Sequence, residues 1–160
     1  MKEVILITGS SRGIGAATAL PAARQGYAVC VNYVRDAQAA EALRARIVAE
    51  GGEAIAVQAD VSEEADVARL FDEVDARLGT LTALVNNVGV LERKCRLADM
   101  SVQRLERVLR TNVISYFLCC QQAVRRMSTA NGGQGGRIVN VSSVAARIGS
   151  PEEYIDYAAS

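Results

Sequence analysis

Residues 4–15 decide the fold, because they join a strand-like run to a glycine-rich turn, and they read VILITGSSRGIG. The run VILI is apolar without interruption, as expected for a parallel strand covered on both faces. Gly9, Gly13 and Gly15 follow it and open a helix-like stretch. Missing side chains let a backbone approach a pyrophosphate, and a helix N-terminus supplies free N–H groups. The stretch predicts a dinucleotide-binding turn; a plain strand-to-helix turn is the alternative.

Strand-like and helix-like stretches alternate along the rest of the chain. Strands are expected at residues 28–33, 54–58, just before 86, and 138–141; helices are expected at 14–25, 36–50, after 60 with Ser62 as N-cap, and up to about Met127. This alternation predicts an α/β protein, a Rossmann-like doubly wound parallel sheet in three layers, with strand order 3-2-1-4-5. Residues 1–160 are expected to form a single dinucleotide-binding domain.

Composition excludes several classes of function. The 160 residues carry 18 basic and 18 acidic side chains, so nothing favours nucleic acid or an anionic membrane as partner. The N-terminus resembles no signal peptide, and no apolar stretch approaches the length of a membrane span, so a cytoplasmic protein is expected. Cys30, Cys95, Cys119 and Cys120 lack zinc-ligand spacing, and histidine is absent, so no metal site is expected.

Four motifs resemble those of the short-chain dehydrogenase/reductase family. They are the glycine turn, the NNVG stretch at residues 86–89, the serine pair Ser142 and Ser143, and Tyr157. The overall sequence resembles NADP-dependent members of the family, of the 3-oxoacyl-reductase or glucose-dehydrogenase kind. The resemblance implies an oxidoreductase that interconverts a carbonyl and a secondary alcohol by hydride transfer, with a small-molecule substrate.

The resemblance assigns Asn112, Ser143 and Tyr157 to catalysis. Hydride addition to a carbonyl leaves an alkoxide, which needs hydrogen-bond donors and a proton. Ser143 would donate to the oxygen, Tyr157 would surrender the proton, and Asn112 would hold a relay water. Ser142 is the less favoured serine in the alignment. Tyr154 is the rival tyrosine, but the residue four positions after it is an alanine rather than a lysine.

The same resemblance and the glycine context define the cofactor-binding set. Its members are Gly9, Ser11, Arg12, Gly13, Ile14, Gly15, Asn32, Tyr33, Arg35, Asp60, Val61, Asn86, Gly89 and Tyr157. The second strand ends without the carboxylate typical of NAD sites, whereas Arg12 and Arg35 could pair with a 2′-phosphate. NADP is therefore expected over NAD, with two solvated surface arginines as the alternative. The family usually has alanine at Val88.

The family places a lysine four residues after its tyrosine, one position beyond Ser160. We therefore expect a C-terminally truncated sequence that lacks the substrate-binding part and is inactive alone, from a parent that is a homotetramer or homodimer. Two alternatives stay open: a non-catalytic dinucleotide-binding module, and a plain interaction protein. The second leaves the glycine turn unexplained, and a binding module has no use for the three catalytic side chains.

Overall fold

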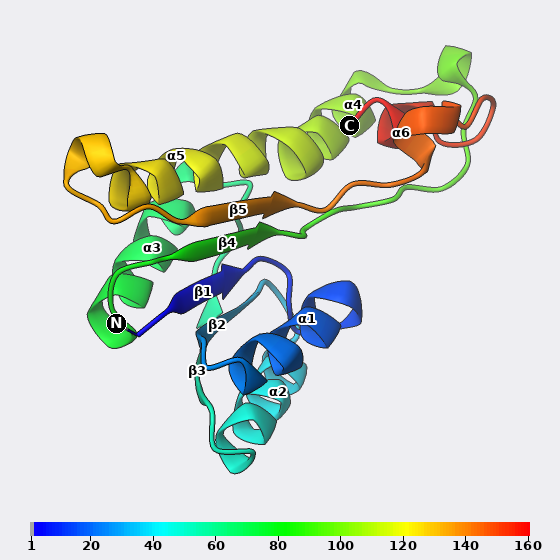
Figure 1. Ribbon diagram of the computed structural model, residues 1–160. Coiled ribbons are helices and arrows are strands. Elements are labelled where there is room, and N and C mark those ends of the chain that lie inside the picture. The colour runs from blue at the N-terminus through cyan, green and yellow to red at the C-terminus, as the bar shows by residue number, and fades with distance from the viewer. Residues whose placement is uncertain (1) are drawn as a thin grey trace.

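The computed structural model describes residues 2–160 and contains one five-stranded parallel sheet (Figure 1). The strands are β1 (Val4–Ile7), β2 (Ala28–Tyr33), β3 (Glu53–Gln58), β4 (Ala83–Asn86) and β5 (Arg137–Asn140). Their order is β3-β2-β1-β4-β5, and every neighbouring pair is parallel. This confirms the predicted doubly wound sheet and its strand order.

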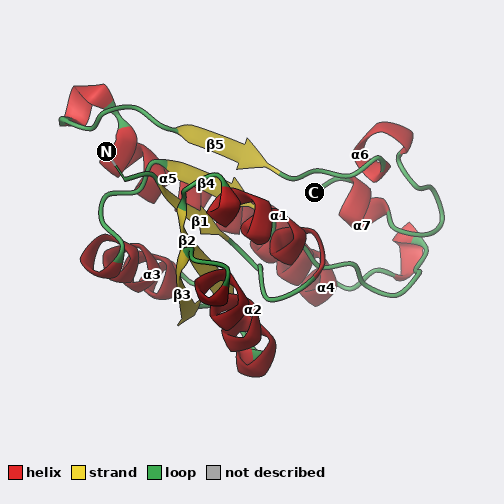
Figure 2. Cartoon of the chain, turned by 60° about the horizontal axis from the view of Figure 1, so that its bottom comes forward, coloured by secondary structure: helices red, strands yellow, loops and turns green. Residues whose placement is uncertain are grey.

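The helices that connect the strands cover both faces of the sheet. They are α1 (Gly13–Arg24), α2 (Ala37–Ala49), α3 (Glu64–Arg77), α4 (Val102–Leu109) and α5 (Ser115–Met127). Two short helices, α6 (Ala145–Ile148) and α7 (Ile155–Ala158), follow the last strand. Short 3-10 turns lie at η1 (Leu97–Asp99) and η3 (Thr129–Asn131), and a π-helical segment, η2 (Arg110–Ile114), joins α4 to α5. Figure 2 shows the strands between α3 on one side and α1 with α2 on the other.

Alternate residues of the central strands pack into two separate hydrophobic cores. On β1, Val4 and Leu6 pack into the cluster formed with α3 and α5, whereas Ile5 and Ile7 pack into the cluster formed with α1 and α2. Side chains on a strand point alternately to opposite faces, so a strand covered on both sides must be apolar throughout. The run VILI meets that requirement, and all four residues are buried.

Several element boundaries differ from expectation, most of them by one residue. Ser62 is not the N-cap of α3, which begins at Glu64; its N–H and hydroxyl both donate to Asp60 Oδ1 instead. The hydrogen bonds to the Asp60 carboxylate orient Ser62 away from the start of α3, so it does not cap that helix. Strand β5 covers residues 137–140 rather than 138–141, although the Val141 N–H still donates to Asn86 O. The long helical region does end at Met127, but η2 interrupts its regular winding.

The carboxyl ends of the strands carry the polar segments of the chain. The glycine turn follows β1, the NNVG stretch follows β4, and the serine pair follows β5. Parallel strands end at the same edge of a sheet, and ligands of such sheets bind there. Across residues 2–160, no helix has both the length and the apolar character needed to cross a bilayer.

Candidate active site

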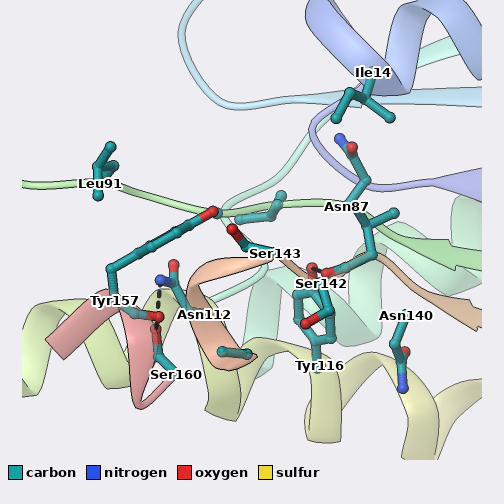
Figure 3. Close-up of a pocket in the computed structure, with 14 residues that line it drawn as sticks. Ile14, Asn87, Leu91, Asn112, Tyr116, Asn140, Ser142, Ser143, Tyr157 and Ser160 are labelled. Carbon is teal, nitrogen blue, oxygen red and sulfur yellow. Dashed lines mark hydrogen bonds between the residues drawn. The ribbon is translucent and has the colours of Figure 1, made fainter. Parts of the chain in front are cut away.

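A cavity of about 450 Å³ opens at this edge of the sheet (Figure 3). Five of the residues predicted for the site line it: Ile14, Gly89, Asn112, Ser143 and Tyr157. They come from α1, the loop after β4, η2, the loop after β5, and α7. Segments up to 143 positions apart in the chain are therefore gathered around one space. The remaining predicted residues are not among its lining residues: Gly9, Ser11, Arg12, Gly13, Gly15, Asn32, Tyr33, Arg35, Asp60, Val61 and Asn86.

The glycine turn has a backbone that favours glycine. Gly9 and Gly13 have φ angles of 59° and 58°, in the left-handed region. A Cβ on Gly9 would stand 2.8 Å from Val88 Cγ2, so the valine packs directly on the turn. A Cβ on Gly15 would stand 2.7 Å from Ser10 Cα, because α1 lies close against the turn there. Around Gly13 the same test finds open space.

Hydrogen bonds to the loop after β4 hold the turn in place. Asn87 Nδ2 donates to Thr8 O (2.9 Å) and to Gly9 O (3.2 Å). Thr8 Oγ1 accepts from the Asn87 N–H (2.9 Å) and the Val88 N–H (3.2 Å). Asn86 and Gly89 of this stretch are predicted site residues; Asn87 is not, although its amide contacts the turn.

Asn32 holds the same turn from the side of β2. Its Oδ1 accepts from the Gly9 N–H (3.1 Å), while its Nδ2 donates to Ala59 O (3.0 Å). The residue is fully buried, so its amide is committed to the protein interior. The turn is thus fixed from two neighbouring strands before any ligand binds.

The start of α1 suits a phosphate group. Within residues 2–160 its N-cap, Arg12, makes no side-chain cap, and the first turn contains no acidic residue. The first N–H groups of a helix have no partner in the helix itself, and they carry a partial positive charge. With open space over Gly13 and the turn held rigidly, these residues fit the pyrophosphate of a dinucleotide.

The residues predicted to contact the adenosine half of the cofactor lie at or after the ends of three neighbouring strands, β1, β2 and β3. Arg12 and Arg35 are exposed, and in the described part of the chain neither takes part in an ion pair. Asp60 is half-buried; its Oδ1 accepts from Ser62, and its N–H donates to Asp66 Oδ2 (2.8 Å). Tyr33 is half-buried and Val61 is buried.

Asn112 is placed by the π-helical segment. It is buried, and its Oδ1 accepts from the Val90 N–H (2.8 Å). Its Nδ2 donates to Val90 O (3.1 Å) and to Ser160 Oγ (2.9 Å). A π segment changes the direction of the side chains that it carries and is frequent at functional sites. Asn112 therefore joins the helix layer to the loop after β4 and to the segment that holds Tyr157.

Ser143 and Tyr157 face the cavity from different sides. In Figure 3 the Tyr157 hydroxyl points toward Ser143. Ser143 Oγ accepts from the Ala145 N–H (3.2 Å), which leaves its own proton free to donate. Tyr157 lies on the four-residue helix α7, and its carbonyl accepts from Ser160 Oγ (3.1 Å). Ser142 also lines the cavity, whereas Tyr154 is not among its lining residues.

Tyr116 also lines the cavity, although it is not a predicted site residue. Its hydroxyl donates to Val141 O (3.1 Å), the residue just before the serine pair. Burial raises the pKa of Tyr116 to about 12, with a smaller contribution from Tyr157. Tyr116 is therefore a neutral donor that fixes the end of β5. A single tyrosine on a helix carries no spacing signal, so its role could not be found from the sequence.

Asn86 faces away from the glycine turn. Its Nδ2 donates to Asn140 Oδ1 (2.9 Å) and to Cys120 Sγ (3.3 Å), between β5 and α5. The residue is buried, and no hydrogen-bond partner for its Oδ1 is found among residues 2–160. The side chain thus links β4 to β5.

The geometry defines a doubly wound α/β protein in which a serine, a tyrosine and an asparagine line one cavity beside a glycine-rich turn. A model of the short chain dehydrogenase family matches residues 3–160. The chain belongs to that family.

Similar proteins agree with this assignment. An uncharacterized oxidoreductase, YgfF, of Escherichia coli (strain K12) is 52% identical over 98% of this chain and 64% of its own length. A 3-oxoacyl-[acyl-carrier-protein] reductase of Synechocystis sp. is 40% identical over 93% of this chain and 59% of its own length. The solved short-chain dehydrogenase/reductase from Serratia marcescens BCRC 10948 superposes with a TM-score of 0.90 at 32% identity, covering 98% of this chain and 62% of that one. The chain thus spans about three fifths of the relatives it matches.

Proposed function

We propose that the protein containing this chain interconverts a carbonyl and a secondary alcohol, with NADP as cofactor and Tyr157 as general acid and base. One observation carries the proposal: Asn112, Ser143 and Tyr157 line one cavity beside a turn shaped for a phosphate. The names of similar proteins, which include oxidoreductases and 3-oxoacyl reductases, support it.

The side chains divide the work of the reduction. When bound at the glycine turn, a nicotinamide cofactor would supply the hydride for the carbonyl carbon. Ser143 donates a hydrogen bond to the carbonyl oxygen and stabilises the negative charge that develops there. Tyr157 gives its proton to that oxygen, which completes the alcohol. Asn112 bonds to Val90 and to Ser160, so that it fixes the loop after β4 and the segment after α7 relative to Tyr157.

Replacing Tyr157 by phenylalanine tests this chemistry in the intact protein. Tyr157→Phe removes the proton donor and little else, so we expect kcat to fall by roughly 10²–10⁴-fold while NADPH still binds. The assay would use a panel of ketones that includes a 3-oxoacyl thioester. Tyr154→Phe is the matched control, because Tyr154 does not line the cavity and its ring centroid lies 6.0 Å from Lys94 Nζ. This variant should keep full activity.

Two results would contradict the proposal. Activity that survives in Tyr157→Phe but is lost in Tyr154→Phe would show that the catalytic tyrosine has been misassigned. A parent protein that binds NADPH but reduces no member of the panel would indicate a binding module instead.

Arg12 and Arg35 are proposed to select NADP by pairing with its 2′-phosphate. Guanidinium groups bind phosphate through forked hydrogen bonds, and both side chains are exposed near the phosphate turn. Arg35→Ala should weaken NADPH binding roughly tenfold, the value of one charge-assisted hydrogen bond, and leave NADH binding unchanged. Fluorescence titration with each cofactor measures both affinities. An equal NADPH-to-NADH ratio in parent and variant would show that Arg35 is only a surface charge.

A further inference from the structure

A buried ion pair lies directly beside the candidate catalytic tyrosine. Arg104 Nε donates to Asp156 Oδ2 (2.6 Å) and Arg104 Nη2 donates to Asp156 Oδ1 (3.0 Å), so the contact is bidentate. The Asp156 side chain is 1% exposed and the Arg104 side chain 11%, unlike most ion pairs of this chain. The pair connects α4 to α7 across 52 positions of sequence.

The helix that carries Tyr157 has little stability of its own. It spans only Ile155–Ala158, and within residues 2–160 its N-cap, Tyr154, makes no side-chain cap. Helices of this length are unstable without tertiary contacts. The position of the Tyr157 backbone must therefore be set by what α7 touches.

The ion pair provides that contact at the residue next to the tyrosine. Asp156 Oδ1 accepts from the Tyr157 N–H (3.0 Å) as well as from Arg104. Arg104 Nη1 also donates to Arg93 O (2.6 Å), in the loop whose Leu91 lines the cavity. One guanidinium thus joins α4, the cavity loop and the tyrosine segment. The pKa of Asp156 is held below its usual range, chiefly by the hydrogen bonds from Arg104.

We propose that Arg104 and Asp156 form a positioning pair that holds Tyr157 in its catalytic place. The proposal rests on the function proposed above for Tyr157. Neither residue touches the reacting atoms, so the pair acts through the backbone of α7. Misplacement of a catalytic group by about 1 Å can lower a rate roughly 100-fold, so an ion pair that touches no reacting atom can still matter for turnover.

The test compares three arginine variants of the intact protein. Arg104→Met keeps the apolar stem but loses the ion pair, Arg104→Lys keeps the charge without the fork, and Arg107→Met is the control. Arg107 lies on the same helix and pairs with Glu92 at an exposed site. We expect kcat to fall roughly tenfold to 100-fold in Arg104→Met, with NADPH affinity unchanged, and to recover in part in Arg104→Lys. Arg107→Met should match the parent.

Amide hydrogen exchange supplies a second readout that does not depend on activity. The peptide that contains Tyr157 should exchange faster in Arg104→Met than in the parent or in Arg107→Met. If Arg104→Met does not fold, Asp156→Asn replaces it, because this variant keeps an acceptor for the Tyr157 N–H and loses only the charge. We expect a smaller fall in kcat in Asp156→Asn than in Arg104→Met.

The outcomes separate the two proposals. An unchanged kcat and unchanged exchange in folded Arg104→Met would overturn the positioning pair, as would a loss of NADPH binding equal to the loss of kcat. Faster exchange in Arg104→Met, from a parent without any carbonyl turnover, would instead refute the catalytic function and leave the anchoring of α7 standing.

Discussion

Among single residues, Gly13 and Gly15 serve the phosphate turn in different ways. A Cβ on Gly15 would meet Ser10 Cα and Asn87 Nδ2 at 2.7 Å, so α1 would have to move away from the turn. A Cβ on Gly13 would meet nothing within 4 Å, but it would enter the space proposed for the cofactor phosphate. One glycine permits packing and the other leaves room for a ligand.

We therefore expect Gly15→Ala to act mainly on stability and Gly13→Ala mainly on binding. Overpacking at Gly15 should lower the free energy of unfolding by about 1–3 kcal/mol. The left-handed backbone at Gly13 should cost an alanine about 1–2 kcal/mol, with a weakening of NADPH binding that exceeds this loss. Urea unfolding and NADPH titration measure the two effects separately. Identical losses of affinity in both variants would show that Gly13 does not face the phosphate.

A residue of the site could be predicted only where it belongs to a sequence motif with a fixed spacing. Gly9, Ser143 and Tyr157 belong to spaced motifs and could be named from the sequence, and Ser143 and Tyr157 line the cavity. Asn87 was missed although its neighbour Asn86 was named, because adjacent amides look alike in sequence. Only the fold shows that one of them turns toward Thr8 and Gly9 while the other turns toward β5.

On the scale of elements, α5 fixes the end of β5 through one hydrogen bond. The Tyr116 hydroxyl donates to Val141 O, and the serine pair follows directly. Tyr116→Phe leaves that carbonyl without its partner, so we expect a loss of about 1 kcal/mol in the free energy of unfolding and a lower kcat from a displaced Ser143. NADPH binding at the glycine turn should be unaffected. A variant with parent-like kcat would show that β5 holds the serine without help.

The same residue predicts a pH dependence whose sign follows from its raised pKa. In the unfolded chain the phenol ionises near pH 10, whereas in the fold its pKa is about 12. The stabilisation is thus complete below pH 10 and is lost as the pH rises toward 12. Other tyrosines are common to parent and Tyr116→Phe, so they cancel in the comparison. The difference in unfolding free energy should stay constant from pH 7 to 9 and decrease above pH 10; a constant difference up to pH 12 would contradict the burial of this hydroxyl.

Regular elements were predictable, and irregular ones were not. The apolar run of β1 and the alternation after it indicate strands and helices through local periodicity, which the sequence contains directly. The π segment η2 depends instead on the Asn112 amide bonding to Val90, 22 positions away in the chain. The predicted N-cap of α3 was wrong for a local reason: the Ser62 hydroxyl donates to the Asp60 carboxylate instead of capping the helix.

For the whole molecule, the two edges of the sheet differ in how well they are covered. Strand β3 lies at one edge, with its apolar residues packed into the two cores and polar Glu53 and Gln58 at its ends. Strand β5 lies at the other edge; among residues 2–160 it pairs only with β4, and all four of its residues are exposed. Ile138 is 37% exposed and Val139 53%. An uncovered apolar edge strand offers free N–H and C=O groups to another chain.

A polypeptide of these 160 residues should therefore self-associate through β5. Light scattering should show an average mass that rises with protein concentration. Val139→Lys places a charge on the edge and should reduce the association at equal concentration, because a lysine there opposes strand pairing. Val48→Lys is the matched control, since Val48 is 48% exposed on α2 and lies away from the edge, and it should associate like the parent. A parent polypeptide that stays monomeric at every concentration, or equal association in Val139→Lys and Val48→Lys, would show that β5 is not the contact.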